Sequence, residues 1–341
     1  MDNQQIMKIL NEKRNLINEE IFKHLPKKEP KELYDIIQDY PSRGGKRLRS
    51  TLCLLSCEAF GEDPKKALTT AAAIEIVHEF GLIHDDIEDD SDYRRGKPTL
   101  HRIYGTPLAI NAGDALQLKG WEVILKNREI LGEKKTFEIL KECIMMGTEL
   151  AEGQTLELSW VKNKKWDITE EDYFKMCSKK TSWYTCITPL RMGAIIANAK
   201  PQCLESLIEF GFNLGIAFQI QDDVLNLLGE EKKYGKEIGG DIYEGKRTLM
   251  LIHLLKSCKP KEKSKIIRIM NKERHEKTVD EVKYIISLMK KHGSIKYAKE
   301  KAFMSLEKAK KIYKEKIEEH LLEEPKKILE AVIQFIIERS F

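Results

Sequence analysis

The sequence predicts an all-α protein, a single large helical bundle over residues 1–341, and two observations lead to this fold class. Long segments rich in Leu, Ile, Ala, Glu and Lys alternate with short breaks at proline or glycine, which is the pattern of consecutive helices. Alternating apolar and polar residues, the pattern of half-buried strands, are rare. A chain of 341 residues can bury a large core, and we expect one domain.

The first part of the chain predicts two helices followed by a basic loop. Residues 1–39 are expected to form two polar amphipathic helices with a proline-containing break between them. The segment 41–49 then combines a glycine pair with four cations. Gly45 lets the backbone approach a ligand closely, and Lys46 and Arg49 are spaced to face one anion. The segment opens the next helix, where backbone N–H groups favour phosphate, although a plain basic turn remains the alternative.

An apolar run at 67–83, with no proline and one glycine, predicts a buried helix that ends in a cluster of aspartates. Asp85 and Asp89 are four residues apart and share a helical face, and Asp86 and Asp90 form a second such pair. Carboxylates this close repel one another unless cations are present. Their oxygens suit Mg²⁺, which also binds phosphate, whereas the alternative is a solvated acidic helix end.

Basic residues flank this acidic helix end on both sides. His78 lies seven residues before Asp85, nearly two helical turns, and so faces the same way; it is a ligand contact or a structural histidine. The loop 91–99 carries Arg94 and Arg95, which are adjacent and cannot share a helical face. We expect them to bind two different anions, with surface pairing to the nearby acids as the alternative.

The middle of the chain predicts three more helices. Two are expected at 108–128 and 134–158. A third is expected to begin at Thr169, where the sequence has the form of a capping box. This third helix runs to Lys180 and Thr181, where cations and a hydroxyl interrupt a core-like sequence.

The segment 207–228 repeats the design of the first acidic helix. An apolar helix, expected from Leu207 to Ile220, again delivers an aspartate pair, Asp222 and Asp223, 137 positions after the first. Surface charge does not explain such a recurrence. Two facing carboxylate clusters are able to hold several Mg²⁺ ions around one diphosphate.

The last part of the sequence predicts a lid and a scaffold. Residues 229–245 contain five glycines and several cations, which favours a flexible lid over a phosphate. The lysines of this segment and its border are Lys232, Lys233, Lys236 and Lys246. Residues from about 255 to the end are expected to be helical, with a break at Gly293 and a last helix marked by Pro325.

Composition limits the partners and the compartment. The formal net charge is +4 with 33% charged residues, so no general attraction to nucleic acid or membrane follows. No stretch of about 18 uninterrupted apolar residues predicts a membrane span, and the polar N-terminus has no secretory pattern. The seven cysteines contain no Cys-x-x-Cys pair, which favours reduced thiols in a cytoplasmic protein.

Taken in order, these motifs resemble those of the trans-isoprenyl diphosphate synthases, and most closely the short-chain geranylgeranyl diphosphate synthases. The resemblance covers about residues 40 to 250. It implies an isoprenoid synthase-like helical fold with a central active-site cavity, usually as a homodimer. It also implies condensation of isopentenyl diphosphate with an allylic diphosphate (dimethylallyl, geranyl or farnesyl), with two or three Mg²⁺ per active site. The motifs that carry it are Gly44-Gly45-Lys46-Arg47-Leu48-Arg49, Asp85-Asp86-x-x-Asp89, Arg94-Arg95-Gly96, Lys180-Thr181, Gln219-x-x-Asp222-Asp223 and Gly235-Lys236 with Asp241 and Lys246.

The resemblance implies a role for individual residues by their position. The magnesium ligands would be Asp85, Asp89 and Asp222. The isopentenyl diphosphate site would consist of Gly45, Lys46, Arg49, His78 and Arg95. The allylic diphosphate would be bound by Arg94, Lys180, Lys236 and Lys246. Thr181 and Gln219 would line the carbocation site, and the aspartates Asp86 and Asp223 complete the catalytic set.

Three further expectations concern variation on this pattern. Asn226 stands where the family has the last aspartate of the second motif, which affects the number of metal ions on that side. Val77, Phe80 and Gly81 would set the product length, since a residue five positions back lies roughly 7–8 Å below Asp85. The resemblance points to the twenty-carbon product. The alternatives are a farnesyl or a longer (C25 and above) product, a terpene cyclase, and a non-catalytic subunit of a heteromeric synthase.

Overall fold

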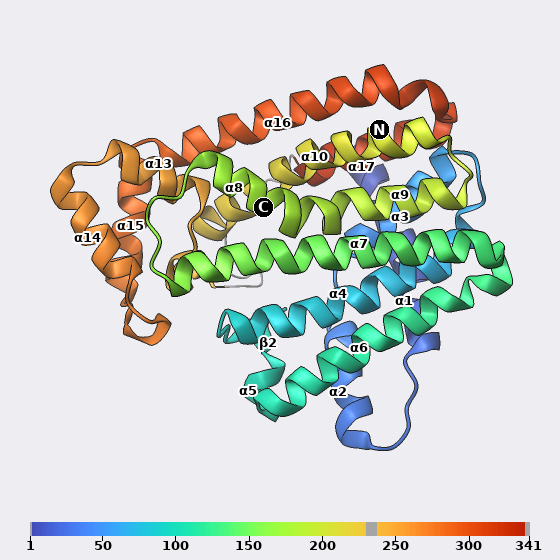
Figure 1. The fold of residues 1–341 in the computed structure, drawn as a ribbon, viewed down its shortest axis with the longest axis horizontal. Coiled ribbons are helices and arrows are strands. Elements are labelled where there is room, and N and C mark those ends of the chain that lie inside the picture. The colour runs from blue at the N-terminus through green and yellow to red at the C-terminus, as the bar shows by residue number, and fades with distance from the viewer. Residues whose placement is uncertain (1, 230–236, 338–341) are drawn as a thin grey trace.

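The computed structural model describes residues 2–229 and 237–337, and these form a stack of long helices (Figure 1). The α-helices are α1 (Asn3–His24), α2 (Lys31–Ser42), α3 (Leu48–Ala59), α4 (Leu68–Glu88), α5 (Leu100–Tyr104), α6 (Thr106–Lys126), α7 (Arg128–Lys162), α8 (Glu170–Cys177), α9 (Thr188–Ile196), α10 (Pro201–Leu228), α12 (Gly240–Tyr243), α13 (Leu249–Ser257), α14 (Pro260–Met270), α15 (Val279–Lys291), α16 (Ser294–Lys316) and α17 (Glu323–Ile337). Short 3₁₀ turns are η1 (Pro64–Ala67), η3 (Arg274–Glu276) and η4 (Glu318–His320), and η2 (Ser178–Ile187) is a π-helix.

The predicted all-α class is confirmed. Among the described residues the strands are limited to β1 (Tyr93–Arg94) and β2 (Lys97–Pro98), an antiparallel pair of two residues each. The two helices expected in residues 1–39 are α1 and α2, and the basic loop after them opens α3 as expected. The predicted capping box at Thr169 is present, because its side chain accepts a hydrogen bond from the backbone of Asp172.

Three predicted elements differ in extent from the structure. The helix expected at 134–158 is part of α7, which begins at Arg128 and bends at Gly132, where φ is 79°. The helix expected from Leu207 to Ile220 continues to Leu228, so Asp222 and Asp223 lie inside α10 rather than after its end. Of the predicted lid, residues 230–236 lie outside the described part of the chain.

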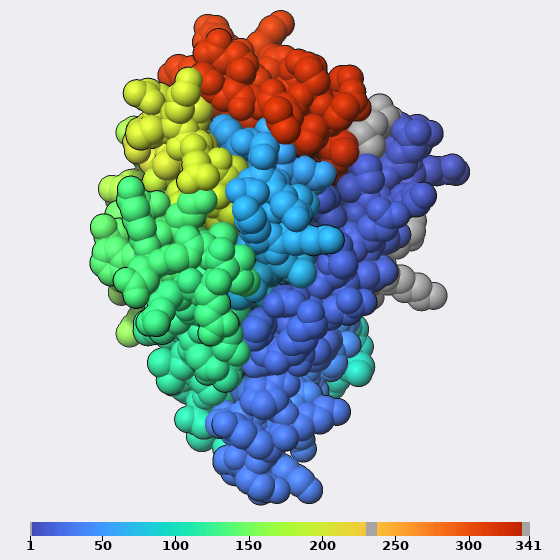
Figure 2. Space-filling model, turned by 90° about the vertical axis from the view of Figure 1, so that its right-hand side faces the viewer, coloured from blue at the N-terminus to red at the C-terminus, as the bar shows by residue number. Residues whose placement is uncertain are grey.

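Three apolar clusters hold the helices together. The first joins α1, α2, α4, α6 and α9, the second joins α8, α10 and α13–α16, and the third joins α3, α9, α10, α16 and α17. In the end view, the N-terminal helices lie along one side, the α6–α7 segment along the other, and the C-terminal helices cover the top (Figure 2). The π-helix η2 contacts α7, α9 and α10, and its Tyr184 reaches His78 of α4, so η2 connects the two helices that carry the aspartate motifs.

One described helix, α10, is long and apolar enough to cross a membrane by composition alone. It contacts η2, α9, α16 and α17, and it carries the second aspartate motif. These contacts account for its apolar residues as those of a core helix.

Candidate active site

The basic loop before α3 brings an arginine from another loop onto its backbone. Arg47, the N-cap of α3, has a left-handed φ of 50° and is 2% exposed. Its guanidinium Nη1 donates to Glu79 at 2.7 Å and to Glu75 at 3.3 Å, so this cation is held inside the protein. A Cβ at Gly45 would lie 3.2 Å from Nη2 of Arg95. Glycine at this position therefore leaves room for the guanidinium of Arg95 beside the loop.

The adjacent arginines Arg94 and Arg95 contact different acids of the protein, and their predicted binding of two different anions stays a prediction. Arg95 Nη1 donates to the backbone oxygen of Tyr40 at 2.6 Å and to Glu79 at 3.1 Å. Arg94 is buried, and its Nη2 donates to Asp85 Oδ2 at 3.2 Å. Each guanidinium is thus fixed by a carboxylate of α4.

A second cluster surrounds His78. The guanidinium of Arg49 lies 4.2 Å from the centre of the Tyr184 ring, and its Nη2 donates to Thr185 Oγ1 at 2.9 Å. Burial and the nearby arginines lower the pKa of His78 well below its usual value, so the imidazole is neutral. Arg49 can only donate, so Nε2 of His78 accepts from Arg49 Nη1 at 3.4 Å. Nδ1 then carries the proton in the contact with the Tyr184 hydroxyl.

The outward aspartates of α4 face two lysines from distant elements. Lys180 Nζ lies 3.5 Å from Asp85 Oδ1, and Lys246 Nζ lies 2.6 Å from Asp89 Oδ2. Burial outweighs the Lys246 ammonium and raises the pKa of Asp89 to about 7. The structure therefore brings Asp85, Asp89, Lys180 and Lys246 together, four residues that the resemblance assigned to magnesium and the allylic diphosphate.

Asp86 points the other way, into the protein. It is fully buried and accepts a 2.5 Å hydrogen bond from the hydroxyl of Tyr40. Arg94 Nε donates to both of its oxygens, at 2.9 and 3.0 Å. Asp86 thus connects α2, α4 and the arginine loop, and its oxygens are occupied by protein donors.

The π-helix η2 packs closely against α7 and α10 at two glycines, Gly153 and Gly215. A Cβ at Gly153 of α7 would lie 2.4 Å from the backbone nitrogen of Lys180, and one at Gly215 of α10 would lie 2.4 Å from the Cα of Ser182. Lys180 Nζ donates to Glu157 of α7 at 2.6 Å. Burial alone would lower the pKa of Lys180, but Glu157 and Asp85 outweigh burial and raise it. Lys180 therefore stays charged beside the aspartates.

The second aspartate motif continues into a hydrogen-bonded chain. Thr181 Oγ1 donates to Gln219 Oε1 at 2.6 Å, and Gln219 Nε2 donates to Asp223 Oδ1 at 2.7 Å. The hydroxyl of Tyr173 donates to Asp223 Oδ2 at 2.7 Å. Asp223 is buried, whereas Asp222 beside it is half-buried. The predicted pair Thr181 and Gln219 is thus in direct contact.

Asn226, which stands in place of the family's last aspartate, contacts the backbone of the segment that follows α10. It is buried, and its Oδ1 accepts a hydrogen bond from the backbone N–H of Asp241 at 3.2 Å. Its backbone oxygen accepts from Gly239 at 2.8 Å. Asn226 therefore fixes the backbone at Gly239 and Asp241, two residues of the predicted lid segment 229–245.

Two predicted anion ligands remain, Lys46 and Lys236. Lys46 is exposed on the loop before α3. Lys236 lies outside the described residues, as do Lys232 and Lys233.

The residues expected to set product length lie on two faces of α4. Val77 packs against α6, where a Cβ at Gly120 would lie 2.4 Å from it. Phe80 is half-buried and meets His84 edge-to-face, with ring centroids 4.8 Å apart. Gly81 faces η2 instead, because a Cβ there would lie 3.4 Å from the Tyr184 hydroxyl.

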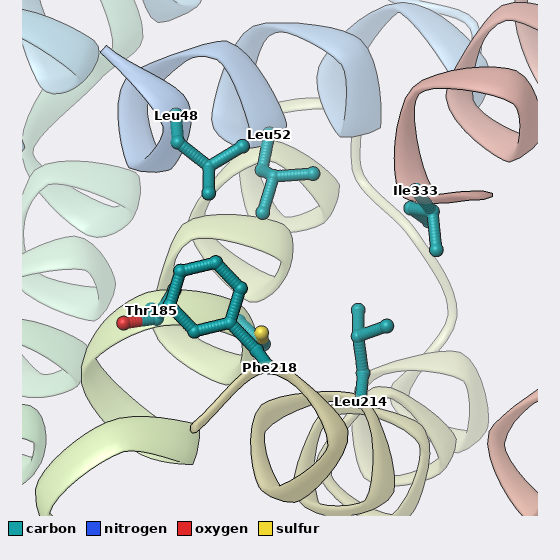
Figure 3. Close-up of a pocket in the computed structure, with 7 residues that line it drawn as sticks. Leu48, Leu52, Thr185, Leu214, Phe218 and Ile333 are labelled. Carbon is teal, nitrogen blue, oxygen red and sulfur yellow. The ribbon is translucent and has the colours of Figure 1, made fainter. Parts of the chain in front are cut away.

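An apolar pocket lies behind the Arg49 cluster, between α3, η2, α10 and α17 (Figure 3). Its volume of about 10 Å³ corresponds to a single water at most. The hydroxyl of Thr185 points away from the apolar side chains and is used by Arg49 (Figure 3). The lining residues are Leu48, Leu52, Thr185, Cys186, Leu214, Phe218 and Ile333.

The chemistry of the donors fits Mg²⁺. Among the described residues, no group of three or more His, Cys, Asp or Glu side chains is gathered closely enough to hold a metal by itself. Mg²⁺ binds through one or two carboxylates and completes its shell with water and phosphate oxygens. Asp85 and Asp89 offer such carboxylates on one face of α4, and the ammonium groups of Lys180 and Lys246 beside them suit the phosphate oxygens that would complete the shell.

Sequence reasoning missed the side chains that hold the predicted residues in place. They are Tyr40, Glu79, Glu157, Tyr173, Tyr184 and Thr185. Glu75 and Glu79 had a visible signal, because two acids four residues apart in an apolar helix demand buried partners. The tyrosines had none, because a buried tyrosine is ordinary in a core.

An all-helical fold with two aspartate motifs, the first of them beside Arg94, Lys180 and Lys246, is typical of an enzyme that handles diphosphates. The comparisons agree: the Polyprenyl synthetase family model matches residues 30–289, and the chain belongs to this family. The chain is 36% identical to a geranylgeranyl diphosphate synthase of Sulfolobus acidocaldarius, over 84% of this chain and 85% of the relative. It is 31% identical to a geranylfarnesyl diphosphate synthase of Natronomonas pharaonis, over 97% of this chain and 96% of the relative.

A solved structure agrees with the fold. The crystal structure of a geranylgeranyl pyrophosphate synthetase from Pyrococcus horikoshii Ot3 is similar with a TM-score of 0.87 and 38% sequence identity, over 99% of both chains. The predicted isoprenoid synthase-like fold is therefore confirmed.

Proposed function

We propose that this enzyme is a Mg²⁺-dependent trans-prenyltransferase that condenses isopentenyl diphosphate with dimethylallyl, geranyl or farnesyl diphosphate to make geranylgeranyl diphosphate. One observation carries the proposal: two separate groups of cations are connected by η2. Arg49 and Arg95 lie on one side, and Lys180 and Lys246 lie beside the carboxylates on the other. Two anion sites of this kind suit two diphosphate substrates.

The residues have separate tasks in this reaction. Bound magnesium would neutralise the leaving diphosphate so that the allylic C–O bond ionises. Lys180 and Lys246 orient the same diphosphate and stabilise its growing charge. Arg49 and Arg95 hold isopentenyl diphosphate so that its double bond attacks the allylic carbon. A proton then leaves the new chain, and the departed diphosphate is able to accept it.

The residue assignments follow the motif positions. The proposed magnesium ligands are Asp85, Asp89 and Asp222. The proposed isopentenyl diphosphate contacts are Gly45, Lys46, Arg49, His78 and Arg95, and the allylic diphosphate contacts are Arg94, Lys180, Lys236 and Lys246. Two or three Mg²⁺ per site fit this set.

Incubation of the purified protein with isopentenyl and allylic diphosphates tests the proposal. Chromatography of the dephosphorylated products should give geranylgeraniol with Mg²⁺ and no product with a chelator. Cyclic hydrocarbons from the allylic substrate alone would instead identify a terpene cyclase. Product only after addition of a second, different subunit would identify a member of a heteromeric synthase, although the presence of both aspartate motifs argues against that case.

Geranylgeranyl diphosphate is the proposed product because Gly81 leaves space beside Tyr184 that a larger side chain would fill. A geranylfarnesyl synthase among the relatives keeps the C25 product as the alternative. The product assay distinguishes the two by chain length.

A homodimer is the proposed assembly, and an apolar stripe supports it. Helices α6 and α7 lie side by side (Figure 1). Leu118 on α6 is 63% exposed and Phe137 on α7 is 59% exposed, with further large apolar residues at helical spacing around them. Such a stripe is able to pair with its own copy. The other members are Leu108, Ile110, Trp121, Leu125, Ile130, Ile144 and Met145.

Light scattering after gel filtration tests the homodimer. Leu118→Glu and Phe137→Glu should yield monomers, whereas Phe303→Glu, at an equally exposed apolar residue of α16, should leave the dimer intact. A monomeric wild-type protein would contradict the proposal.

We further propose that residues 1–341 act as one synthase domain, since α16 packs on α10 and α17 packs on α3. We also propose that the protein is cytoplasmic, which is consistent with seven free cysteines.

A further inference from the structure

Four side chains from three elements form a continuous hydrogen-bonded chain beside the reactive site. The chain runs from Tyr173 on α8 to Asp223 and Gln219 on α10, and it ends at Thr181 on η2. Its three bonds measure 2.7, 2.7 and 2.6 Å. Tyr173, Asp223 and Thr181 are buried, and Gln219 is half-buried. Thr181 follows Lys180, whose ammonium contacts Asp85.

The carboxylate of Asp223 sets the direction of every bond in the chain. An ionised carboxylate only accepts, so both the Tyr173 hydroxyl and the Gln219 amide nitrogen donate to it. The amide of Gln219 is thereby oriented, with its oxygen toward Thr181. The Thr181 hydroxyl must then donate to that oxygen, which leaves its own lone pairs outside the chain.

The same contacts argue against Asp223 as a metal ligand. Each of its oxygens already accepts a hydrogen bond from a protein donor, and the residue is only 6% exposed. A cation would have to displace Tyr173 or Gln219 from a buried position, which leaves a buried donor unsatisfied. Asp222, the preceding residue, is more exposed than Asp223, since it is only half-buried.

We propose that Asp223 is a positioning residue rather than a magnesium ligand: it orients the Gln219 amide, and through it the Thr181 hydroxyl, so that the lone pairs of Thr181 stabilise the allylic cation. The proposal rests on the proposed prenyl transfer. A dipole that is held in place before the cation forms needs no reorganisation when the C–O bond breaks. Tyr173 fixes the second oxygen of Asp223 and so keeps the carboxylate from rotating.

Asp223→Asn tests the direction of the chain with almost no change in volume. The amide offers one acceptor oxygen and one donor where the carboxylate offers two acceptors, so the hydrogen bond of Tyr173 or of Gln219 must reverse and the Gln219 amide is no longer held in one orientation. We expect the single-turnover rate to fall by about 10²-fold, because misplacement of a reacting group typically costs that much. The KM values for both substrates should stay within about twofold of wild type, because the diphosphate contacts lie on other residues.

Magnesium binding provides a readout that does not depend on turnover. Calorimetric titration of Mg²⁺ in the presence of an allylic thiolodiphosphate, which does not ionise readily, should give the same affinity for Asp223→Asn and wild type. Asp222→Asn is the matched variant, and we expect it to weaken Mg²⁺ binding. Equal weakening in both variants would make Asp223 a metal ligand and overturn the proposal, as would a wild-type single-turnover rate in folded Asp223→Asn.

Tyr173→Phe keeps the proposal testable where Asp223→Asn does not fold. It removes one donor and leaves the Asp223–Gln219–Thr181 bonds in place, so we expect a smaller loss in rate with unchanged Mg²⁺ affinity. A Tyr173→Phe variant with wild-type rate or with weakened Mg²⁺ binding would contradict the proposal. An inactive wild-type protein would instead refute the proposed function itself.

Discussion

The two aspartate motifs sit on helices of similar design, yet the protein uses them differently. In both motifs the second aspartate, Asp86 or Asp223, is buried and accepts a hydrogen bond from a tyrosine of another helix. At Asp86 the other partner is the cation Arg94, whereas at Asp223 it is the neutral amide of Gln219. The first motif thus fixes a guanidinium, and the second fixes an amide.

The difference shows how a buried carboxylate is stabilised with and without a counter-ion. Asp86 lies against a guanidinium that compensates for its lost hydration. Asp223 has only neutral donors in contact, and burial raises its pKa to about 7 although both hydrogen bonds lower it. A buried carboxylate with neutral partners alone contributes little to the stability of the fold. A role in orienting Gln219 therefore explains why Asp223 occupies this position.

The largest expected effect concerns the outward aspartates. Asp85→Ala and Asp222→Ala should each lower turnover by about 10³-fold or more, because magnesium supplies several kcal/mol of charge stabilisation. The helices should remain folded, since Asp85 and Asp222 are only half-buried, and Arg94 and Lys180 keep Asp86 and Glu157 as partners without Asp85. Turnover and circular dichroism of each variant check this. A folded Asp85→Ala protein with near-normal turnover would refute the metal assignment.

The next effect distinguishes the two inward aspartates by stability. Asp86→Ala leaves the buried Arg94 without its main partner and should lower the free energy of unfolding by about 3–5 kcal/mol. Asp223→Ala leaves neutral donors unsatisfied and should cost about 1–3 kcal/mol. Urea unfolding without ligands measures both values. Equal losses would mean that the counter-ion makes no difference.

A third effect separates the two anion sites. Arg49→Ala should raise the KM for isopentenyl diphosphate about 10–100-fold and change the allylic KM little, since a charge-assisted hydrogen bond contributes about 1.5–3 kcal/mol. Lys246→Ala should raise the KM for the allylic diphosphate and change the KM for isopentenyl diphosphate little, because Lys246 contacts Asp89. Steady-state kinetics with each substrate varied in turn decides between one shared site and two. Equal effects of both variants on both substrates would exclude two sites.

The smallest expected change is in product length rather than rate. Gly81→Phe places an aromatic ring against Tyr184 and should shorten the product toward farnesyl diphosphate. Phe80→Ala should lengthen it, if its contact with His84 closes the path of the tail. Chromatography of dephosphorylated products measures both. An unchanged distribution in both variants would mean that residues on another helix end the chain.

The sequence alone determined a large part of this protein. Helical periodicity and proline and glycine breaks predicted α1, α2, α4 and α6, and the spacing of Asp85 and Asp89 predicted that they share a face. These features are local, because a helix fixes the relative direction of residues within a few turns. Motif order also sufficed to predict the family, since it does not depend on how the helices pack.

Only the tertiary structure decided which aspartate of each pair turns inward and what it meets there. Periodicity places Asp85 and Asp86 on different faces but does not say which face is buried. Tyr40 reaches Asp86 across 46 residues and Tyr173 reaches Asp223 across 50. Such contacts depend on how helices pack, and a buried tyrosine leaves no mark in the sequence that distinguishes it from core. The π-helix η2 is of the same kind, because its position is set by close contact with glycines of α7 and α10.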